Sequence, residues 1–330
     1  MMNNCGQLSR NLVRRQLMAR PFAEVLAELA DRDPRICGVS CDCWGFLAPL
    51  ARKFPERAIE LGIAEQNLIG VAAGLAVRGK IPFAIGMNPF VTMRCFEQIR
   101  TDLGYGRRNV KVIGGYGSGL SFAAWGATHH AMEEIALMRL IPEMKVIMPA
   151  DLWETEHAVT AAAAMDGPFY IALAQGQLTP PPDERTQATE AAEQNRTFEV
   201  GKASVLRNGD AATVIATGPI ISEALVAAEL LAAKGISIRV LSMHTIKPID
   251  REAISHAAQE TPLIITLEEH TVVGGLGGAV AEVLADAGAG TPLKRLGLQD
   301  VFAVMSGSHS DFRDRFGMSA QAVVDAVLNK

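Results

Sequence analysis

Short apolar runs alternate with longer amphipathic stretches along most of the 330-residue chain. Nearly continuous apolar runs are typical of parallel strands covered by helices on both faces, and a hydrophobic period near 3.6 residues indicates a helix. In the first half, the runs predict strands at Ile36–Ser40, Ala58–Leu61, Ile81–Ile85, Val110–Gly114, Lys145–Met148 and Phe169–Leu173. The stretches between them predict helices at Pro21–Asp31, Glu65–Arg78, Val91–Leu103, Ala131–Arg139 and Leu152–Ala164. This alternation favours an α/β fold with doubly wound, mainly parallel sheets.

A polar segment that opens with Thr179-Pro180-Pro181-Pro182 interrupts the alternation and has the composition of an interdomain linker. After it, strands are predicted at Thr213–Thr217, Ser237–Leu241, Leu263–Leu267 and Lys294–Leu298, and helices at Ile220–Lys234, Asp250–Gln259, Gly277–Ala287 and Ala320–Leu328. We therefore expect an N-terminal extension at 1–19, a first α/β domain at 20–178, a linker at 179–197 and a second α/β domain at 198–330.

The bulk composition restricts the class of protein. Apolar residues make up 49% and charged residues 20%, which is ordinary for a globular protein, and a net charge of −5 gives no reason to expect a nucleic-acid partner. No apolar run approaches the ~20 residues of a membrane span. Five cysteines without a secretory signal favour a reducing compartment and hence the cytoplasm. The first twenty residues hold four arginines and no acid, which is weakly similar to a transit peptide, but a frayed start before the first helix is the favoured interpretation.

Glu65 is the first candidate for chemistry. It opens a predicted helix directly after the strand Ala58–Leu61 and the turn at Gly62. Open α/β sheets bind ligands at the carboxyl ends of their strands, although the helix dipole by itself also favours an acid in a first turn. Four residues apart on the same helix, Gly70 and Gly74 share a face. They predict close approach of another backbone, either inside the domain or at a subunit interface.

Several ordered motifs resemble the C-terminal half of transketolases, from about Arg20 to the end of the chain. In the first domain they are Glu60-Leu-Gly-Ile-Ala-Glu-Gln-Asn67, Phe96-Glu-Gln-Ile-Arg100, Gly126-Ala-Thr-His-His130 and Glu133-Glu-Ile-Ala-Leu-Met-Arg139. In the second domain they are Thr245-Ile-Lys-Pro-Ile-Asp250 and Glu268-Glu-His-Thr-Val-Val-Gly-Gly-Leu-Gly277. The resemblance implies a transketolase-like pyrimidine-binding domain followed by a transketolase C-terminal domain.

The same resemblance implies thiamine diphosphate as the cofactor. Glu65 would contact its pyrimidine and assist loss of the thiazolium proton, because a carboxyl group in an apolar pocket can share a proton there. Phe90 and Met87, where the family usually has an aromatic residue, would pack on the ring, and Asp42 would also lie beside the cofactor. The chain has no Gly-Asp-Gly followed by a distant Asn, the motif with which the family holds the diphosphate and Mg²⁺. A separate N-terminal-half subunit is therefore expected to carry it, in an assembly of at least α₂β₂.

For the substrate, the resemblance implies that His129 reaches oxygen atoms and moves protons, which a side chain with a near-neutral pKa suits. His130 stands where a glutamine is usual, and Arg20 is a possible phosphate contact. Four sugar-phosphate positions depart from the family pattern: Trp125 replaces an acid, Gly117 a histidine and Gln175 an arginine, and a serine is lost near Phe46.

Retained activation residues beside altered substrate residues predict a transketolase-like transferase. It would move a two-carbon ketol unit from a ketose-like donor to an aldehyde acceptor, on a substrate with fewer hydroxyls or no phosphate. Two alternatives remain: the β subunit of a 2-oxoacid dehydrogenase-type enzyme or a two-carbon acyl loader, and a non-catalytic stabilising subunit.

Overall fold

The first domain of the computed structural model is built on a seven-stranded sheet of strand order β10-β5-β6-β4-β3-β1-β2. The structure describes residues 22–122, 125–173, 197–305 and 307–329. Six strands of this sheet are parallel: β1 (Ile36–Ser40), β2 (Ala58–Glu60), β3 (Ile81–Gly86), β4 (Lys111–Gly114), β5 (Lys145–Ile147) and β6 (Phe169–Ala172). Their helices are residues 22–32, α2 (Trp44–Lys53), α3 (Glu65–Val77), α5 (Glu134–Leu140) and α6 (Leu152–Ala164).

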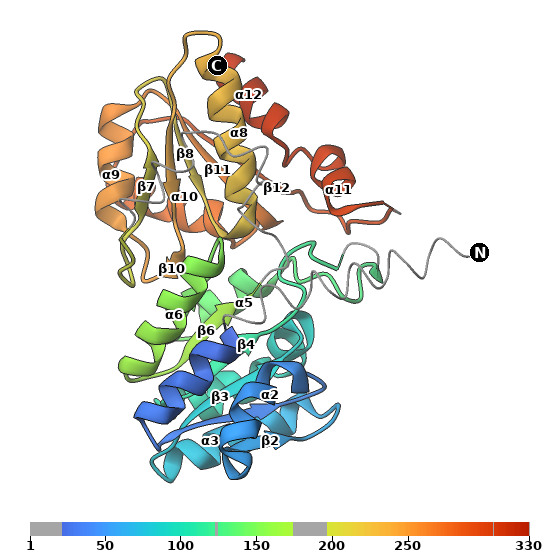
Figure 1. Ribbon diagram of the computed structural model, residues 1–330. Helices are drawn as coiled ribbons and strands as arrows, with labels where there is room; N and C mark the ends of the chain where they lie inside the picture. Colours follow the sequence, from blue (N-terminus) through green and yellow to red (C-terminus); the bar gives the residue numbers. More distant parts are fainter. Residues whose placement is uncertain (1–21, 123–124, 174–196, 306, 330) are drawn as a thin grey trace, which may run out of the picture.

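The second domain has a five-stranded sheet of order β12-β11-β8-β9-β7, in which only the pairing of β7 is antiparallel. Its strands are β7 (Ser204–Arg207), β8 (Thr213–Ala216), β9 (Arg239–Ser242), β11 (Ile264–Thr271) and β12 (Leu293–Leu298). Its helices are α8 (Ile221–Ala232), α9 (Arg251–Glu260), α10 (Leu276–Asp286), α11 (His309–Arg315) and α12 (Ala320–Leu328). Figure 1 shows the two domains stacked, with α5, α6 and β10 at the junction.

The predicted α/β class and all ten predicted strands are confirmed, with ends that move by at most four residues. The pattern did not reveal α2, because Pro49 lies inside it and proline disfavours a helix interior. It also missed β7, β10 and α11. The predicted helix Val91–Leu103 is helical but irregular: π-helical turns at Phe90–Arg94 and Ile99–Tyr105 flank the short α4 (Phe96–Gln98). The predicted N-terminal extension and almost all of the predicted linker lie outside the described residues.

The second domain completes the first sheet. Its strand β10 (Thr245–Lys247) pairs antiparallel with β5, and Thr245 lies opposite Ile147. Lys247 Nζ donates to the carbonyl oxygens of Arg139 and Ile141 at the end of α5, at 2.8 and 2.6 Å. One cluster of buried apolar side chains continues from the first domain into the second. The two domains therefore share a core.

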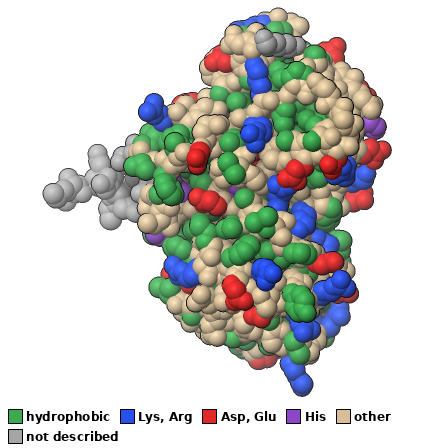
Figure 2. All heavy atoms as spheres, turned by 180° about the vertical axis from the view of Figure 1, so that it is seen from behind, with side chains coloured by type: hydrophobic (Ala, Val, Ile, Leu, Met, Phe, Trp, Pro, Cys, Tyr) green, Lys and Arg blue, Asp and Glu red, His purple; other side chains and the backbone are tan. Residues whose placement is uncertain are grey.

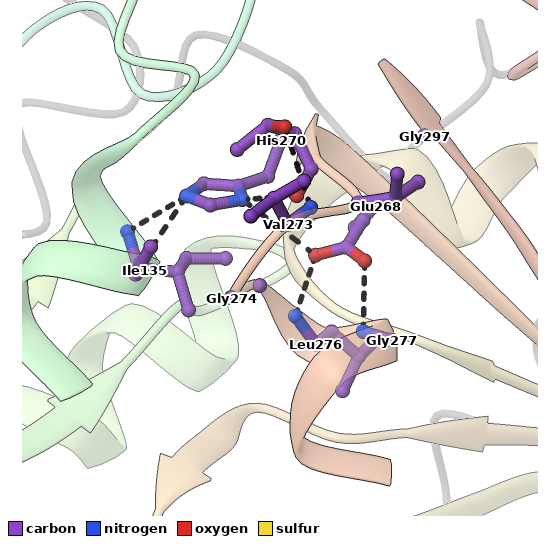
Figure 3. Close-up of polar contacts among 12 residues, drawn as sticks. Ile135, Glu268, His270, Val273, Gly274, Leu276, Gly277 and Gly297 are labelled. Carbon is purple, nitrogen blue, oxygen red and sulfur yellow. Dashed lines mark hydrogen bonds and ion pairs between the residues drawn. The ribbon is translucent and has the colours of Figure 1, made fainter. Parts of the chain in front are cut away.

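A buried histidine fixes the same junction (Figure 3). The Nε2 atom of His270, on β11, accepts hydrogen bonds from the backbone N–H groups of Ile135 and Ala136 at 3.1 and 3.3 Å, and Nδ1 lies 2.7 Å from the carbonyl oxygen of Thr271. These contacts require a neutral ring that carries its proton on Nδ1. Burial lowers the pKa of His270 to about 4, in agreement with that state.

Two neighbouring acids on β11 flank His270 in sequence and have different environments. The carboxylate of Glu268 accepts from the N–H groups of Leu276 and Gly277 at the start of α10, at 2.5 and 2.8 Å (Figure 3). Burial nevertheless raises the pKa of Glu268 to about 7. Burial opposes ionisation of Glu269 as well, but Arg313 and His309 hold its pKa far below the usual range. Glu269 Oε2 also accepts from the N–H of Leu120 in the first domain, at 3.4 Å.

Neither charge dominates the face of the molecule that is turned toward the viewer in Figure 2. Acidic and basic side chains are intermingled on the face that Figure 2 shows. None of the helices in the described ranges is both long and apolar enough to cross a membrane. Within the same ranges, Cys37, Cys41, Cys43 and Cys95 are free thiols, and all four are buried.

Candidate active site at the carboxyl edge of the first sheet

Four neighbouring strands bring the predicted site residues to one edge of the first sheet. The strands β4, β3, β1 and β2 are consecutive and parallel, so the segments that follow them share an edge. Asp42 follows β1, Glu65 follows β2, Met87 follows β3, and the loop of residues 115–130 follows β4. Ligands bind at such an edge in open α/β sheets.

Glu65 is the first residue of α3 and is only 4% exposed. Its Oε2 atom lies 2.7 Å from Nη1 of Arg94, and the Arg94 guanidinium lies 4.4 Å from the centre of the Phe90 ring. The sequence analysis expected apolar surroundings for this carboxylate. In this structure a cation faces it instead. The sequence analysis missed Arg94. Its position four residues after Phe90 in a helical segment was the available signal.

Met87 and Phe90 lie in the segment that turns from β3 into the first π-helical stretch, and both are half-buried. The carbonyl oxygen of Met87 accepts from the N–H groups of Phe90 and Val91 at 3.0 and 2.8 Å, which fixes this turn. Asn88 between them is fully buried, and its Oδ1 atom has no hydrogen-bond partner within the described part of the chain. π-Helical turns often occur at functional sites.

A buried carboxylate, Glu134, organises the floor of this edge. It is the first residue of α5 and accepts from Asn88 Nδ2 at 2.9 Å, from Ser118 Oγ at 2.5 Å and from the hydroxyl of Tyr170. Burial raises the pKa of Glu134. Through these bonds one side chain ties the segment around Asn88 to the loop after β4. The sequence analysis gave Glu134 no role, because its partners come from three distant segments.

His129 and Trp125 lie on the exposed side of the same loop. His129 is half-buried, Nδ1 is 2.9 Å from Thr128 Oγ1, and burial lowers the pKa of the ring. Its ring centre is 5.2 Å from that of Phe90 and 5.0 Å from that of Trp125. The structure thus brings His129 and Trp125 together with Phe90, as the predicted site requires.

The structure does not bring His130 into this group. His130 is buried, and its ring packs edge-on against Phe312 of the second domain, with 5.5 Å between ring centres. This placement argues against the predicted substrate contact, because adjacent residues in the loop point in opposite directions. The remaining predicted substrate residues, Arg20 and Gln175, lie outside the described residues.

Asp42 is exposed and has a positive φ of 53°, which asparagine and aspartate tolerate better than most residues. Its N–H donates to Glu60 Oε1 at 2.9 Å, and the N–H of Gly62 donates to the same atom at 2.9 Å. Glu60 therefore holds together the two loops that flank Glu65. Within the described ranges, no group of three or more His, Cys, Asp or Glu side chains could hold a metal ion.

Comparison with known proteins identifies the family. Residues 16–181 match the transketolase pyrimidine-binding domain, and residues 201–323 match the transketolase C-terminal domain. A putative transketolase C-terminal section from Methanocaldococcus jannaschii is 37% identical over 315 residues, which are 95% of this chain and 96% of that protein. A 6-deoxy-6-sulfo-D-fructose transketolase subunit from a Clostridium species is 38% identical over 308 residues, with 93% and 92% of the two chains covered.

Structural similarity gives the same result. A solved structure described as a split gene transketolase, an inactive β4 tetramer, superposes with a TM-score of 0.82 at 38% identity, covering 94% of this chain and 97% of that one. The transketolase of Campylobacter jejuni shares the fold at 20% identity and a TM-score of 0.74, but this chain spans 46% of its length. The chain belongs to the transketolase family and corresponds to the C-terminal section of a split transketolase.

Proposed function

We propose that this chain is the C-terminal-half subunit of a thiamine diphosphate-dependent transketolase that moves a two-carbon ketol unit from a ketose-like donor to an aldehyde acceptor. The observation that carries the proposal is the position of Glu65. It is a nearly fully buried carboxylate at a helix start, on the carboxyl edge of a parallel sheet, and Arg94 contacts both this carboxylate and the Phe90 ring. The chain activates the cofactor in this proposal, and a partner holds most of it.

The residues present fit one end of this cofactor. Half-buried Met87 and Phe90 offer an apolar surface for a ring, and Glu65 offers a carboxylate at the same sheet edge, linked to Phe90 through Arg94. The buried Oδ1 atom of Asn88, which has no hydrogen-bond partner among the described residues, lies in the same segment. When bound, thiamine diphosphate supplies a carbon nucleophile and an electron sink. Glu65 would hold or share a proton at the pyrimidine nitrogen, and Phe90 and Met87 would orient the ring.

Arg94 gives the free subunit an additional feature. The ion pair with Arg94 occupies the Oε2 atom of Glu65. A proton can then be shared through Oε1, or through Oε2 once the arginine has moved. Arg94 is 44% exposed, so that its side chain has room to reorient toward solvent. His129 would accept or donate a proton at a substrate oxygen, because burial keeps its ring neutral near pH 7.

The partner is proposed to be an N-terminal-half subunit with the Gly-Asp-Gly and distant Asn motif, which would hold the diphosphate and Mg²⁺ in at least an α₂β₂ assembly. On α3, Gly70 and Gly74 are exposed, and no atom lies within 4 Å of a Cβ built at either position. The close neighbour that the sequence predicts therefore does not come from the described part of this chain. Ile63 and Val77, at the two ends of α3, are 76% and 59% exposed. These surfaces support a subunit interface.

The test is reconstitution with the partner subunit, thiamine diphosphate and Mg²⁺, followed by product analysis with ketose phosphates and with 2-oxoacids. Ketol transfer that requires both chains supports the proposal. Oxidative or acyl-transfer products from 2-oxoacids alone would favour the 2-oxoacid dehydrogenase-type or acyl-loader alternative. Full activity of the partner without this chain would leave only the stabilising role. The cytoplasm remains the predicted location, because the prediction is based on the cysteine content.

A further inference from the structure

The loop after β4 has two buried ends and a more exposed middle. We define its first stem as Ser118–Leu120 and its second stem as His130–Met132. Both stems are buried, whereas residues 125–129 between them are half-buried or exposed. The stems lie against each other, because the N–H of Ala131 donates to the carbonyl oxygen of Gly119 at 3.0 Å. A displacement of the first stem therefore also moves the second stem, which begins directly after His129.

The second domain holds both stems, although they belong to the first domain in sequence. Leu120 and Met132 are members of the buried apolar cluster that the second domain mainly builds, and Phe312 on α11 is another member. The N–H of Thr271 on β11 donates to the carbonyl oxygen of Met132 at 2.8 Å. The ring of His130 packs edge-on against Phe312. The loop is thus anchored on β11 and α11.

Glu269 on β11 makes the closest contact with the first stem. Gly119 has a φ of +58°, and a Cβ atom there would lie 2.7 Å from both the Cβ atom and the carbonyl oxygen of Glu269. Glycine is the residue that allows the backbone of the stem to come this close to β11. The N–H of Leu120 donates to Oε2 of Glu269 at 3.4 Å. The side chain of Glu269 therefore contacts the stem directly.

An ion cluster fixes the side chain of Glu269. We define the cluster as Glu223 on α8, Glu269, and His309 and Arg313 on α11. Nε of Arg313 donates to Oε1 of Glu269, and Nη1 donates to Glu223 Oε1 at 3.1 Å. Nε2 of His309 lies 2.8 Å from the Glu269 carboxylate. The side chains of Arg313 and Glu269 are only 12% and 9% exposed, so water screens their attraction little.

We propose that Glu269 is a positioning residue of the site. Held by Arg313, it fixes the first stem and thereby the place of His129 beside Phe90, whose ring centre is 5.2 Å away. This inference rests on the proposed function, in which His129 moves a proton at a substrate oxygen. A misplacement of about 1 Å can lower a rate ~100-fold, so the anchor of the loop matters for the chemistry. The second domain then contributes to the reaction as well as to assembly.

Glu269→Gln tests the inference, and Glu223→Gln is its matched control. Each variant alters one of the two carboxylates to which Arg313 donates. The second contact of Glu223 is the N–H of Ala320, within the second domain. An amide has a single oxygen, so a glutamine at 269 that accepts from Arg313 turns its NH₂ group toward the N–H of Leu120. Only Glu269→Gln therefore deprives the stem of its acceptor.

Hydrogen exchange of the full chain is the first measurement and needs no partner subunit. We expect the amides of residues 118–122 to exchange at least ~10-fold faster in Glu269→Gln than in the wild type, because a hydrogen bond to a charged group is lost. Glu223→Gln should exchange like the wild type in this segment. Gly119→Ala leaves the ion cluster intact and should accelerate the same amides by pushing the stem away from β11. Equal rates in all proteins, or equal acceleration in both glutamine variants, would overturn the inference.

The second measurement uses the complete enzyme with partner, thiamine diphosphate and Mg²⁺, hydroxypyruvate as donor and glycolaldehyde as acceptor. We expect Glu269→Gln to lower kcat at least ~10-fold through the misplaced histidine. Deuterium exchange at C2 of the cofactor should keep the wild-type rate, because Glu65 is unchanged. Glu223→Gln should keep the wild-type kcat.

The two measurements separate failure of this inference from failure of the proposed function. Equal kcat values for Glu269→Gln and Glu223→Gln would overturn the positioning role and leave ketol transfer intact. Slowed C2 exchange in Glu269→Gln would also overturn it, because the defect would then reach the cofactor rather than the loop. No ketol transfer by the wild-type enzyme would overturn the proposed function, and with it the catalytic consequence of the anchor. Hydrogen exchange would still decide whether Glu269 holds the loop.

Discussion

At the domain junction, Glu268 accepts two backbone N–H groups and His270 accepts two more, all from the same chain. At the carboxyl edge of the first sheet, buried Glu65 faces Arg94, whose side chain is 44% exposed, and Ile63 nearby is 76% exposed. Both regions place acids or a histidine at helix starts, where backbone N–H groups are available. At the junction, the N–H groups of α5 that His270 binds join the two domains within one polypeptide.

The difference indicates which of the two regions is fully packed within this chain. Burial of the junction histidine and acids is complete within this chain, and Glu134 under the sheet edge is equally buried. The layer above Glu134, with Glu65, Phe90, His129 and Trp125, is open to a varying degree. A layer of this kind, on a well-packed base, is what a site shared with a second chain requires. The predictions below compare the two regions by changing one residue at a time.

The largest effect is expected on assembly. Gly74→Leu should abolish association with the partner subunit, because a large side chain would separate surfaces that the exposed glycine allows to meet. The isolated chain should keep its fold or gain about 1 kcal/mol, since leucine favours a helix more than glycine. Analytical ultracentrifugation and urea unfolding measure the two effects. Normal assembly of the variant would show that α3 does not lie in the interface.

The base of the site should be the most sensitive to truncation. Glu134→Ala leaves Asn88, Ser118 and Tyr170 without their shared acceptor in a fully buried place. We expect a loss of about 3–5 kcal/mol in the free energy of unfolding, from the cost of unpaired buried polar groups. Chemical denaturation compares it with Glu97→Ala, an exposed control. A loss as small as that of the control would contradict the assigned role.

The junction should show a pH dependence with two opposite contributions. The pKa of His270 is lowered to about 4, so its contribution to stability is lost as pH falls from 6.5 to 4. The pKa of Glu268 is raised to about 7, so its contribution is lost as pH rises from 4.5 to 7. The two nearly cancel in the wild type.

Single variants should separate these contributions. From pH 7 to pH 4.5, His270→Asn should gain stability on acidification and Glu268→Gln should lose it, each by up to about 3 kcal/mol relative to the wild type. Urea unfolding at half-unit pH intervals measures both slopes. Parallel curves for the three proteins would show that neither group titrates in this window.

The smallest effect is expected for the ion pair at the sheet edge. Arg94→Met should change the free energy of unfolding by at most about 1 kcal/mol, because the arginine is partly exposed and water screens the pair. Thermal unfolding with and without 0.5 M salt measures it. A loss above about 3 kcal/mol would mean that the Glu65–Arg94 pair is a structural element like those of the junction.

The sequence predicted the parallel architecture because buried strands such as β1 and β3 are continuous apolar runs. It also placed Glu65 at the carboxyl edge of a strand, and the family resemblance assigned Phe90 and His129 to the same site. It could not predict β10, Arg94 or Glu134. Each of these acts through partners distant in the chain, and spacing carries no information about such contacts. The burial of His130 could not be predicted for the same reason: its neighbour, Phe312, comes from the other domain.

The central claim is that Glu65 of this chain assists proton loss from a cofactor that a second chain holds. Deuterium exchange at the thiazolium C2 of thiamine diphosphate, followed by NMR in the assembled enzyme, tests it most directly. We predict that Glu65→Gln slows exchange at least ~100-fold, the range expected for a lost acid–base contribution, while the cofactor stays bound and the control Glu97→Gln exchanges like the wild type. Exchange at the wild-type rate in cofactor-loaded Glu65→Gln would contradict the account.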